Sequence, residues 1–596
     1  EIMNSLFPDT TYGCESGGDP VNIPDLSYEE FLDFHRQYYH PSNSFIYLYG
    51  NMDMEEKLVF IDEHYLSAFE ALAIDSQIRD QEAFAQVKDI QKNYPVSEDE
   101  GEEDNTYLSY NMVVGEAADI NLSLAFEVLD YALLSAPGAP LKQALLDAKI
   151  GKDIYGSFED GIKQTYFSIV AKGANLSQKE EFVKVIRDTL TKIMEEGIDK
   201  KAVTAGINYY EFRFREADFS SYPKGLIYGL DILGNWLYDD EHPFAQVELI
   251  PVFEKLKSLK NTGYFEELIR KYLLDNPHGS VLTLVPSRGL AARKTKALED
   301  KLADYLNGIS EEEKQQMVQR TKDLEAYQEA EEDPEAAKCI PMLKREDIRK
   351  EADKFYNEEL DVDGSLFLYH DVPTNGIGYL DLMFDLKSLS PDKVLYLGLL
   401  KSVLGYVNTA HYTYGELSNE INAETGGIVC GVEVFDRADS VDEYRAFFGV
   451  KGKVMYPKTD VMFRMIREIL NTSDVTDTRR LHEIISRVKS RAQSSLVSAG
   501  HSTAVLRAAS YGSPMAAFQD AMAGIAYYQF IEKLDKEFEE RKDEIIENLK
   551  SLMTEILRPE NLSVSYTGER ESLETMQKQV RELKKTLHQE AVETSP

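Results

Sequence analysis

Hydrophobic and polar residues alternate along the chain with two different periods. Short runs rich in β-branched, aromatic and aliphatic side chains predict strands, and longer stretches with apolar residues every three or four positions predict amphipathic helices. The two patterns are mixed throughout the sequence, so the predicted fold class is α+β. The clearest predicted strands lie at 106–115, 164–173, 280–287 and 376–386, with a long helix at 121–135.

The N-terminal region is predicted to fold in the order helix, strand, helix. Ser27 and Glu30 form a capping box that starts a helix, and Pro41 ends it. The run SFIYLYG at 44–50 is β-type and closes on a glycine, so it predicts a strand. Residues 54–69 have the spacing of an amphipathic helix.

The end of this region is repeated near the other end of the chain. HPSNSFIYLYG and RPENLSVSYTG share a proline, an asparagine and a glycine at the same spacing, and each is followed by a charged helical stretch. The matched pairs are Pro41 and Pro559, Asn43 and Asn561, and Gly50 and Gly568, an offset of 559 − 41 = 518 residues. This repeat predicts a duplicated unit whose second copy begins near the strand at 376–386. The chain is then expected to begin in the tail of the first copy.

Residues 288–350 differ from the rest of the chain because they are rich in Ala, Lys, Glu and Gln and contain no β-type run. Gly308 interrupts the helical pattern, and Ser310 with Glu313 restarts it as a second capping box. The pattern predicts a long helical hairpin that joins two halves of the molecule. A hinge and a rigid strut are equally consistent with this composition.

The charge of the chain limits its partners. With 65 basic and 105 acidic residues the net charge is −40, which argues against nucleic acid or an anionic membrane as a partner. Basic peptides are compatible with it, and so is an acidic surface that serves solubility alone. No apolar run is long enough to span a membrane.

Cysteine usage indicates a reducing compartment. Cys14, Cys339 and Cys430 are odd in number and far apart, which suggests neither a disulfide framework nor a metal-binding pair. We therefore expect a cytoplasmic protein, or one in an organelle lumen if an upstream segment targets it there.

The ten histidines form no zinc motif of the HxxEH or HExxH type. The nearest string is 60–64, FIDEH, where Phe60 stands in place of the first ligand and His64 is expected to be structural. His35 and His40 are five residues apart and do not share a helical face. No phosphate-binding loop or dinucleotide motif is present, so nucleotide chemistry has no support.

A single stretch resembles the serine elbow of hydrolases. Gly500, Ser502 and Ala504 follow the GxSxG pattern with the last glycine replaced. The elbow requires a preceding strand, but the residues before it have a helical pattern. A turn between two helices, capped by Ser502, is the favoured prediction.

Two longer stretches identify the family that the chain resembles. Residues 12–43, YGCESGGDPVNIPDLSYEEFLDFHRQYYHPSN, are similar to the end of the first domain in the presequence-protease, falcilysin-like branch of the pitrilysin/insulinase zinc metallopeptidases. Residues 415–435, GELSNEINAETGGIVCGVEVF, resemble the start of the third domain of that branch, and the helical hairpin resembles its connector.

This resemblance implies duplicated pitrilysin-like domains of antiparallel sheet and helices, arranged as two bowl-shaped halves that close around an unfolded peptide. The implied divisions of the chain are the end of the first domain at 1–85, an inactive second domain at 86–287, the connector at 288–350 and an inactive third domain at 351–596.

The same resemblance implies that the chemistry lies outside this chain. In the family, the HxxEH zinc helix and a further glutamate ligand precede the position of Glu1, and the assisting arginine and tyrosine come from a fourth domain after Pro596. Zinc is thus expected in the full-length parent protein, and no metal or other cofactor in this chain. The N- and C-terminal domains of the same protein are expected partners.

Degenerate counterparts of the site are implied in the retained domains. The zinc-ligand positions of the third domain are occupied by Leu397, Leu400 and Lys401, which cannot bind zinc. Lys149 and Tyr155 keep the six-residue spacing of the assisting pair in the second domain, with lysine in place of arginine. Both sets are expected to be structural.

The resemblance thus implies the chamber and hinge of a zinc-dependent endopeptidase that degrades unfolded peptides of a few tens of residues, with the fragment alone inactive. In such an enzyme a zinc-bound water attacks the peptide carbonyl. The alternative is a non-catalytic scaffold of the same fold, like the core subunits of respiratory complexes. The expected substrates are peptides, basic ones included, and neither nucleic acid nor a membrane is expected as a partner.

Overall fold

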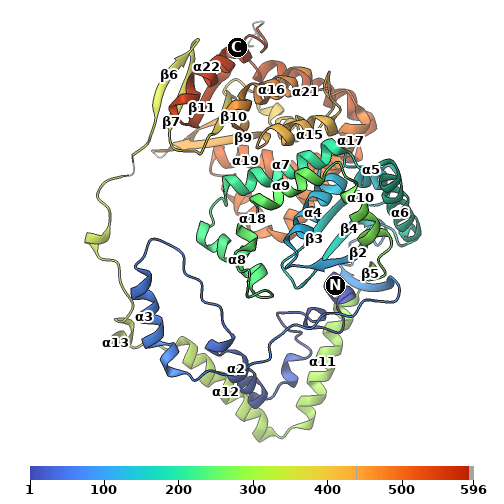
Figure 1. Ribbon diagram of the computed structural model, residues 1–596, viewed down its shortest axis with the longest axis vertical. Helices are drawn as coiled ribbons and strands as arrows, with labels where there is room; N and C mark the ends of the chain where they lie inside the picture. Colours follow the sequence, from blue (N-terminus) through green and yellow to red (C-terminus); the bar gives the residue numbers. More distant parts are fainter. Residues whose placement is uncertain (353, 438, 590–596) are drawn as a thin grey trace.

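Two lobes, each a mixed β-sheet covered by helices, make up most of the computed structural model, which describes residues 1–352, 354–437 and 439–589 (Figure 1). We call residues 88–288 the first lobe and residues 358–584 the second lobe. The predicted α+β class is confirmed.

The sheet of the first lobe has five strands in the order β1-β5-β2-β4-β3. The first two pair in parallel and all other neighbours are antiparallel. The strands predicted at 106–115, 164–173 and 280–287 are confirmed. The bounds are β1 (Lys88–Val96), β2 (Thr106–Glu116), β3 (Asp153–Glu159), β4 (Gln164–Ala174) and β5 (Gly279–Arg288).

The central strand β2 has two differently covered faces because successive side chains point to opposite sides. Tyr110 and Met112 join the core between the sheet and its helices. Asn111 lies on the other face, where its amide donates to the hydroxyl of Ser280 over 3.2 Å. The short helix α1 (Ile2–Leu6) covers this polar face, and Ser5 Oγ lies 2.8 Å from Ser280 Oγ.

Helices of the first lobe cover one face of its sheet and extend toward the second lobe (Figure 1). The helix predicted at 121–135 is confirmed, and its last residues, Tyr131–Ser135, form a wider π-helical turn. The bounds are α4 (Ile120–Asp130), α5 (Pro140–Asp147), α6 (Lys179–Glu196), α7 (Lys200–Glu216), α8 (Lys224–Trp236), α9 (Ile250–Leu259) and α10 (Tyr264–Leu268).

The sheet of the second lobe has six strands in the order β6-β7-β11-β8-β10-β9. Strand β8 lies inside this sheet between β11 and β10, which confirms the central strand predicted at 376–386. The bounds are β6 (Glu358–Val362), β7 (Ser365–Asp371), β8 (Ile377–Asp385), β9 (Ile428–Arg437), β10 (Ser440–Met455) and β11 (Leu562–Gly568).

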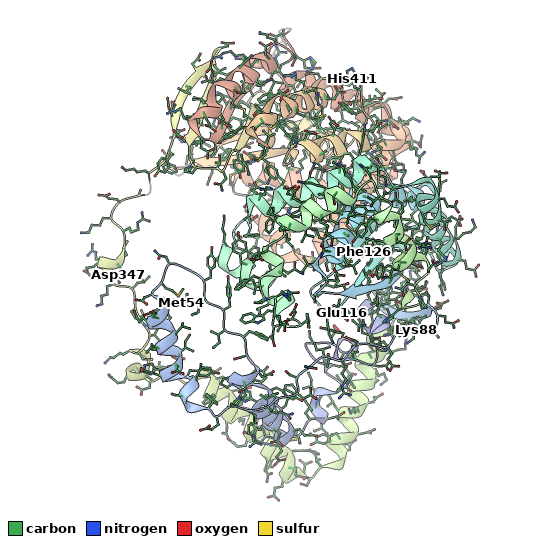
Figure 2. The ribbon with its side chains drawn as sticks, in the orientation of Figure 1. Met54, Lys88, Glu116, Phe126, Asp347 and His411 are labelled. Carbon is green, nitrogen blue, oxygen red and sulfur yellow. The ribbon has the colours of Figure 1, made fainter. Side chains whose placement is uncertain are left out.

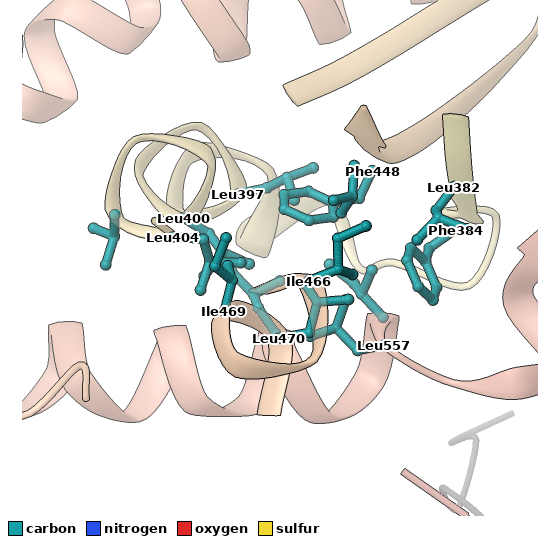
Figure 3. Packing of buried hydrophobic residues seen from close by; sticks show 14 of the residues in the cluster. Leu382, Phe384, Leu397, Leu400, Leu404, Phe448, Ile466, Ile469, Leu470 and Leu557 are labelled. Carbon is teal, nitrogen blue, oxygen red and sulfur yellow. The ribbon is translucent and has the colours of Figure 1, made fainter. Parts of the chain in front are cut away.

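The helices of the second lobe bury a large apolar core against this sheet, part of which is seen in Figure 3. The bounds are α14 (Val394–Val403), α15 (Tyr414–Glu424), α16 (Thr459–Thr472), α17 (Thr478–Ser498), α18 (Gly500–Ala509), α19 (Pro514–Ala523), α20 (Ile525–Lys536), α21 (Phe538–Ile556) and α22 (Arg570–Lys584). Ser502 lies inside α18, whose N-cap residue is Ala499, so the predicted cap at Ser502 is wrong. The helix predicted before it is present as α17.

The two sheets share one topology. In each sheet, the strand that comes last in the sequence pairs in parallel with a strand on one side. On its other side, three further strands follow across the sheet, each antiparallel to its neighbour. The order β1-β5-β2-β4-β3 therefore corresponds to β7-β11-β8-β10-β9, with β6 as an addition at the edge. A duplication is thus visible between the two lobes of this chain, which is a different pair of units from the one predicted from residues 41–50 and 559–568.

A helical hairpin connects the lobes and extends away from both of them (Figure 1). It consists of α11 (Leu290–Gly308) and α12 (Glu311–Glu329), followed by the short α13 (Pro334–Ala337). The predicted break at Gly308 and the capping box of Ser310 and Glu313 are confirmed. Neither long helix has a buried residue.

Residues 28–64 lie outside the apolar cores of the two lobes. The helices α2 (Tyr28–Tyr38) and α3 (Met54–His64) confirm the two predicted helices, although the second is shorter than predicted. The strand predicted at 44–50 is wrong, because this segment has no strand beside it within the described residues to share backbone hydrogen bonds. Instead it lies along α8, where the ring centroid of Phe45 is 4.6 Å from that of Trp236.

Side chains confirm the separation of this region from the lobes. In Figure 2, Met54 at the start of α3 and Asp347 after α13 lie apart from Phe126, which is fully buried in the core of the first lobe.

Candidate functional site

A cavity of about 1920 Å³ lies between the two lobes and is the candidate functional site. The first lobe contributes the turn at 99–105, α5 and α7, and the ends of β3 and β4. The second lobe contributes α14, α15 and α17, the start of β9 and parts of α19, α20 and α21. Its wall is therefore built from elements far apart in the sequence.

Direct hydrogen bonds hold the lobes together beside this cavity. Tyr414 in α15 donates its hydroxyl proton to Gln143 Oε1 in α5, over 2.7 Å. Asn422, also in α15, donates its amide to the hydroxyl of Tyr131, over 2.6 Å. These bonds place α15 of the second lobe against the helices of the first.

A close approach of two backbones strengthens this junction. Gly138 has φ +76°, and a Cβ atom there would lie 3.2 Å from Cα of Gly415. A side chain at this position would be strained by its backbone conformation and would push the lobes apart.

Arginines from α17 give the cavity wall a positive face. Arg480 stacks over the ring of Tyr414 at 3.8 Å and pairs with Glu483 at 3.0 Å. Arg487 lies 5.3 Å from the ring of Tyr406. Burial lowers the pKa of Arg487, and repulsion from Arg480 and Arg491 lowers it further.

A lysine from the first lobe faces these arginines. The ammonium of Lys142 in α5 lies 3.9 Å from the carboxylate of Asp153. Burial lowers the pKa of Lys142; Asp153 opposes this effect, and repulsion from Arg487, Arg491 and Arg480 adds to it. Positive charge thus gathers from both lobes at one place.

Other charges on the wall are neutralised locally. Lys152 pairs with Asp104 at 3.2 Å, and Lys489 pairs with Asp535 at 2.9 Å. Burial acts to raise the pKa of Asp535, but hydrogen bonds from Ser486 and Lys489 hold it below its ordinary value.

Of the two residues predicted as degenerate assisting groups, one lies at the cavity. Lys149 is exposed on the wall, in a left-handed turn with φ +56°, and Gln178 donates to its carbonyl over 2.9 Å. Tyr155 lies on the edge strand β3, is 44% exposed and is not part of the wall. The two side chains are therefore not brought to one site.

The three predicted degenerate ligand positions lie on α14 and divide between core and cavity. Leu397 and Leu400 are fully buried, and Figure 3 shows them packed in the core of the second lobe. Lys401 lines the cavity, where its ammonium donates to the carbonyl of Met522 over 3.1 Å and burial lowers its pKa. Two aliphatic side chains and a lysine do not fit a zinc ion.

Corresponding positions in the first lobe carry acidic groups that sequence reasoning missed. Helix α4 follows β2 as α14 follows β8, and Glu127, Asp130 and Tyr131 have the spacing of Leu397, Leu400 and Lys401. Burial raises the pKa of Glu127 to about 7, although a hydrogen bond from Tyr210 acts against it. The available signal was a glutamate and an aspartate inside an otherwise apolar helical run.

The arginine face of α17 was missed as well, although its positions 480, 487 and 491 share one helical face by spacing. Among the described residues, no three His, Cys, Asp or Glu side chains form a group that could hold a metal ion. In the same part of the chain, no helix is long and apolar enough to cross a membrane.

Comparisons with known proteins match most of the chain. Residues 25–210 match the family model described as Peptidase M16 inactive domain, and residues 284–534 match the one described as Peptidase M16-C associated. The first covers the N-terminal region and much of the first lobe, and the second covers the hairpin and much of the second lobe.

Individual relatives are similar over nearly the whole chain. Protein HypA of Clostridium perfringens is 39% identical over 583 residues, which is 98% of this chain and 60% of that protein. Presequence protease 1, chloroplastic/mitochondrial, of Arabidopsis thaliana is 32% identical over 592 residues, or 97% of this chain and 54% of that protein. The chain therefore spans little more than half the length of these relatives.

Among solved structures, the crystal structure of pitrilysin matches 97% of this chain and 57% of its own, at 14% identity and a TM-score of 0.45.

Proposed function

Because the chain belongs to the presequence-protease branch of the pitrilysin/insulinase family of metallopeptidases, we propose that it forms the peptide-holding chamber and hinge of a zinc-dependent metalloendopeptidase. The proposed substrates are unfolded peptides of a few tens of residues. The observation that carries this proposal is the cavity between the lobes.

The size and position of this cavity support a peptide ligand. Its volume of about 1920 Å³ exceeds the roughly 300–1,000 Å³ typical of small-molecule pockets. It lies between two lobes joined through an exposed hairpin, so a change in their separation would admit or release a long ligand. We therefore assign the hairpin the role of a hinge.

The proposed domain divisions follow the sequence analysis. The end of a first peptidase-like domain occupies 1–85, an inactive second domain 86–287, the connector 288–350 and an inactive third domain 351–596. The remaining length of the relatives, which this chain does not cover, would supply N- and C-terminal domains of the same protein as partners.

Zinc chemistry is proposed to lie in those other domains. Relatives in this family are zinc metallopeptidases. Since the side chains of Leu397, Leu400 and Lys401 do not fit zinc, we assign them, with Lys149 and Tyr155, to structural roles.

The overall charge of −40 favours basic peptides as partners at long range. Three free cysteines favour a cytoplasmic or organellar location.

Peptide binding tests the proposed chamber. A labelled unfolded peptide of a few tens of residues should bind the purified chain, as measured by fluorescence anisotropy. Ser490→Trp, which places a large ring on the cavity wall, should raise the Kd about tenfold or more. The matched control is Ser498→Trp, an exposed position on the same helix outside the wall. Unchanged binding in Ser490→Trp, or no binding at all, would refute the chamber.

The chain alone is expected to bind no stoichiometric zinc and to cleave no peptide, because its candidate positions carry no zinc ligands. Metal analysis of the purified chain and a quenched fluorescent peptide measure the two properties. One tightly held zinc per chain, with cleavage that a chelator abolishes, would contradict this expectation.

A further inference from the structure

A strip of basic side chains crosses the junction of the two lobes inside the cavity. Arg480, Arg487 and Arg491 lie on one face of α17, since they are separated by seven and four residues. Lys142 of the first lobe lies opposite. Lys172, also from the first lobe, donates to Ser494 of α17 over 2.6 Å. We call these five basic residues the junction strip.

Few acidic groups balance the junction strip. Arg480 is paired with Glu483, and Lys142 has only the distant contact with Asp153 at 3.9 Å. Across residues 1–352, 354–437 and 439–589, neither Arg487 nor Arg491 takes part in an ion pair. The strip therefore carries a surplus of positive charge, in a chain whose net charge is −40.

This arrangement is unfavourable as long as no anion is bound. Cations that are partly removed from water lose hydration, and like charges close together repel one another. The lowered pKa values of Lys142 and Arg487 reflect both effects. An anion in the cavity would restore the lost interactions and would contact both lobes at once.

The dimensions of the strip favour an extended chain of carboxylates over a single small anion. Residues 480 and 491 are 11 positions apart on the helix. At 1.5 Å per residue this separation is about 16 Å along the helix axis. An extended peptide covers that distance with about five residues at 3.3 Å each. One phosphate group could contact only part of this length.

We propose that the junction strip binds the carboxylates of an acidic stretch in the peptide that occupies the cavity. This inference rests on the proposed function, since it specifies which segments of the peptide the chamber prefers. The junction strip therefore prefers negatively charged peptide segments, whereas the net negative charge of the whole molecule favours positively charged ones. Basic peptides are attracted to the molecule as a whole, whereas acidic stretches are held at the lobe junction.

Peptides of different charge test the proposal. Labelled oligoglutamate, oligolysine and neutral glycine-serine peptides of equal length are titrated with the full chain, and anisotropy gives each Kd. Oligoglutamate should bind tighter than the neutral peptide. The double variant Arg487→Gln with Arg491→Gln should weaken oligoglutamate binding about tenfold or more, with no change for the neutral peptide. The control is Arg270→Gln, an exposed arginine outside the cavity.

Thermal unfolding of the same variants separates binding from folding. Removing two unpaired cations should leave the Tm unchanged or raise it, whereas a purely structural role of the arginines predicts a lower Tm. Equal affinity for oligoglutamate and the neutral peptide, or an unaffected double variant, would overturn the proposal while leaving the chamber intact. Failure of all three peptides to bind would instead count against the proposed function. If tripolyphosphate binds to the chain and oligoglutamate does not, the proposal is wrong and the junction strip is a site for free phosphates.

Discussion

At the residue scale, Glu127 shows how strongly the surroundings of a side chain can change its pKa. Burial raises the pKa of its carboxyl to about 7, with the nearby Asp160 and Asp130 adding to the effect. The folded protein therefore holds a proton that the unfolded chain releases near the ordinary value of 4.5. Since the folded state binds more protons between these two values, Glu127 lowers stability as the pH rises through that interval.

Glu127→Gln should remove this pH dependence. We expect the variant to match the wild type near pH 4 and to exceed it above pH 7, by at most about 3 kcal/mol. Urea unfolding at a series of pH values measures the difference. Glu325→Gln, at an exposed position of α12, serves as the control. A constant difference between wild type and Glu127→Gln across the series would show that the carboxyl is not buried as described.

The sequence predicts side-chain chemistry better where that chemistry is local. The capping boxes at Ser27 and Ser310 were predictable because a cap depends on residues three positions apart. The arginines of α17 were not, because only the packing of that helix against α14 and α20 turns them toward a common space. The absence of zinc ligands at Leu397 and Leu400 could be predicted, but their fully buried position in the core requires the fold.

At the scale of elements, the four predicted strands that have a neighbouring strand in their lobe are confirmed, and the isolated one at 44–50 is not. Strands β2, β4, β5 and β8 each have partners that accept their backbone hydrogen bonds. Residues 44–50 have the same kind of sequence but no such partner, and they lie along α8 instead. A periodic pattern thus predicts the preference of a segment, while pairing decides the outcome.

Helix α14 provides a test of the structural role assigned to its degenerate ligand positions. Leu400 is fully buried in the core of the second lobe, so Leu400→Ala should lower the free energy of unfolding by about 2–5 kcal/mol. Leu302→Ala, at a position of α11 that is 51% exposed, should change it by less than about 0.5 kcal/mol. Chemical denaturation of both variants measures the two effects. Equal stability would contradict the packing role of Leu400.

At the scale of the whole molecule, the exposed apolar side chains of α2 and α3 stand apart from the well-covered lobes. Phe31 and Phe34 in α2 are 62% and 59% exposed, and Leu58 and Phe60 in α3 are 55% and 59% exposed. Large apolar side chains exposed in this way promote association. We therefore expect this region to be the site at which the chain self-associates or contacts another domain.

Light scattering can measure this association. The purified chain should show a mass that rises with concentration, because each large side chain removed from water contributes about 1.5–3 kcal/mol. Phe31→Asp with Phe60→Asp should reduce that rise, whereas Val505→Asp, at an exposed position of the second lobe, should not. A monomer at every concentration would contradict the expectation.

The parallel pairing at the edge of each sheet also has a consequence for synthesis of the chain. In the first lobe Lys88 pairs with Ser280, and in the second Phe367 pairs with Val564. The first strand of each pair must therefore wait for nearly two hundred further residues to leave the ribosome before it finds its partner. Such distant contacts slow folding, and they divide it into two successive steps, one for each lobe. During each wait, the unpaired strand is the part of the nascent chain most in need of a chaperone.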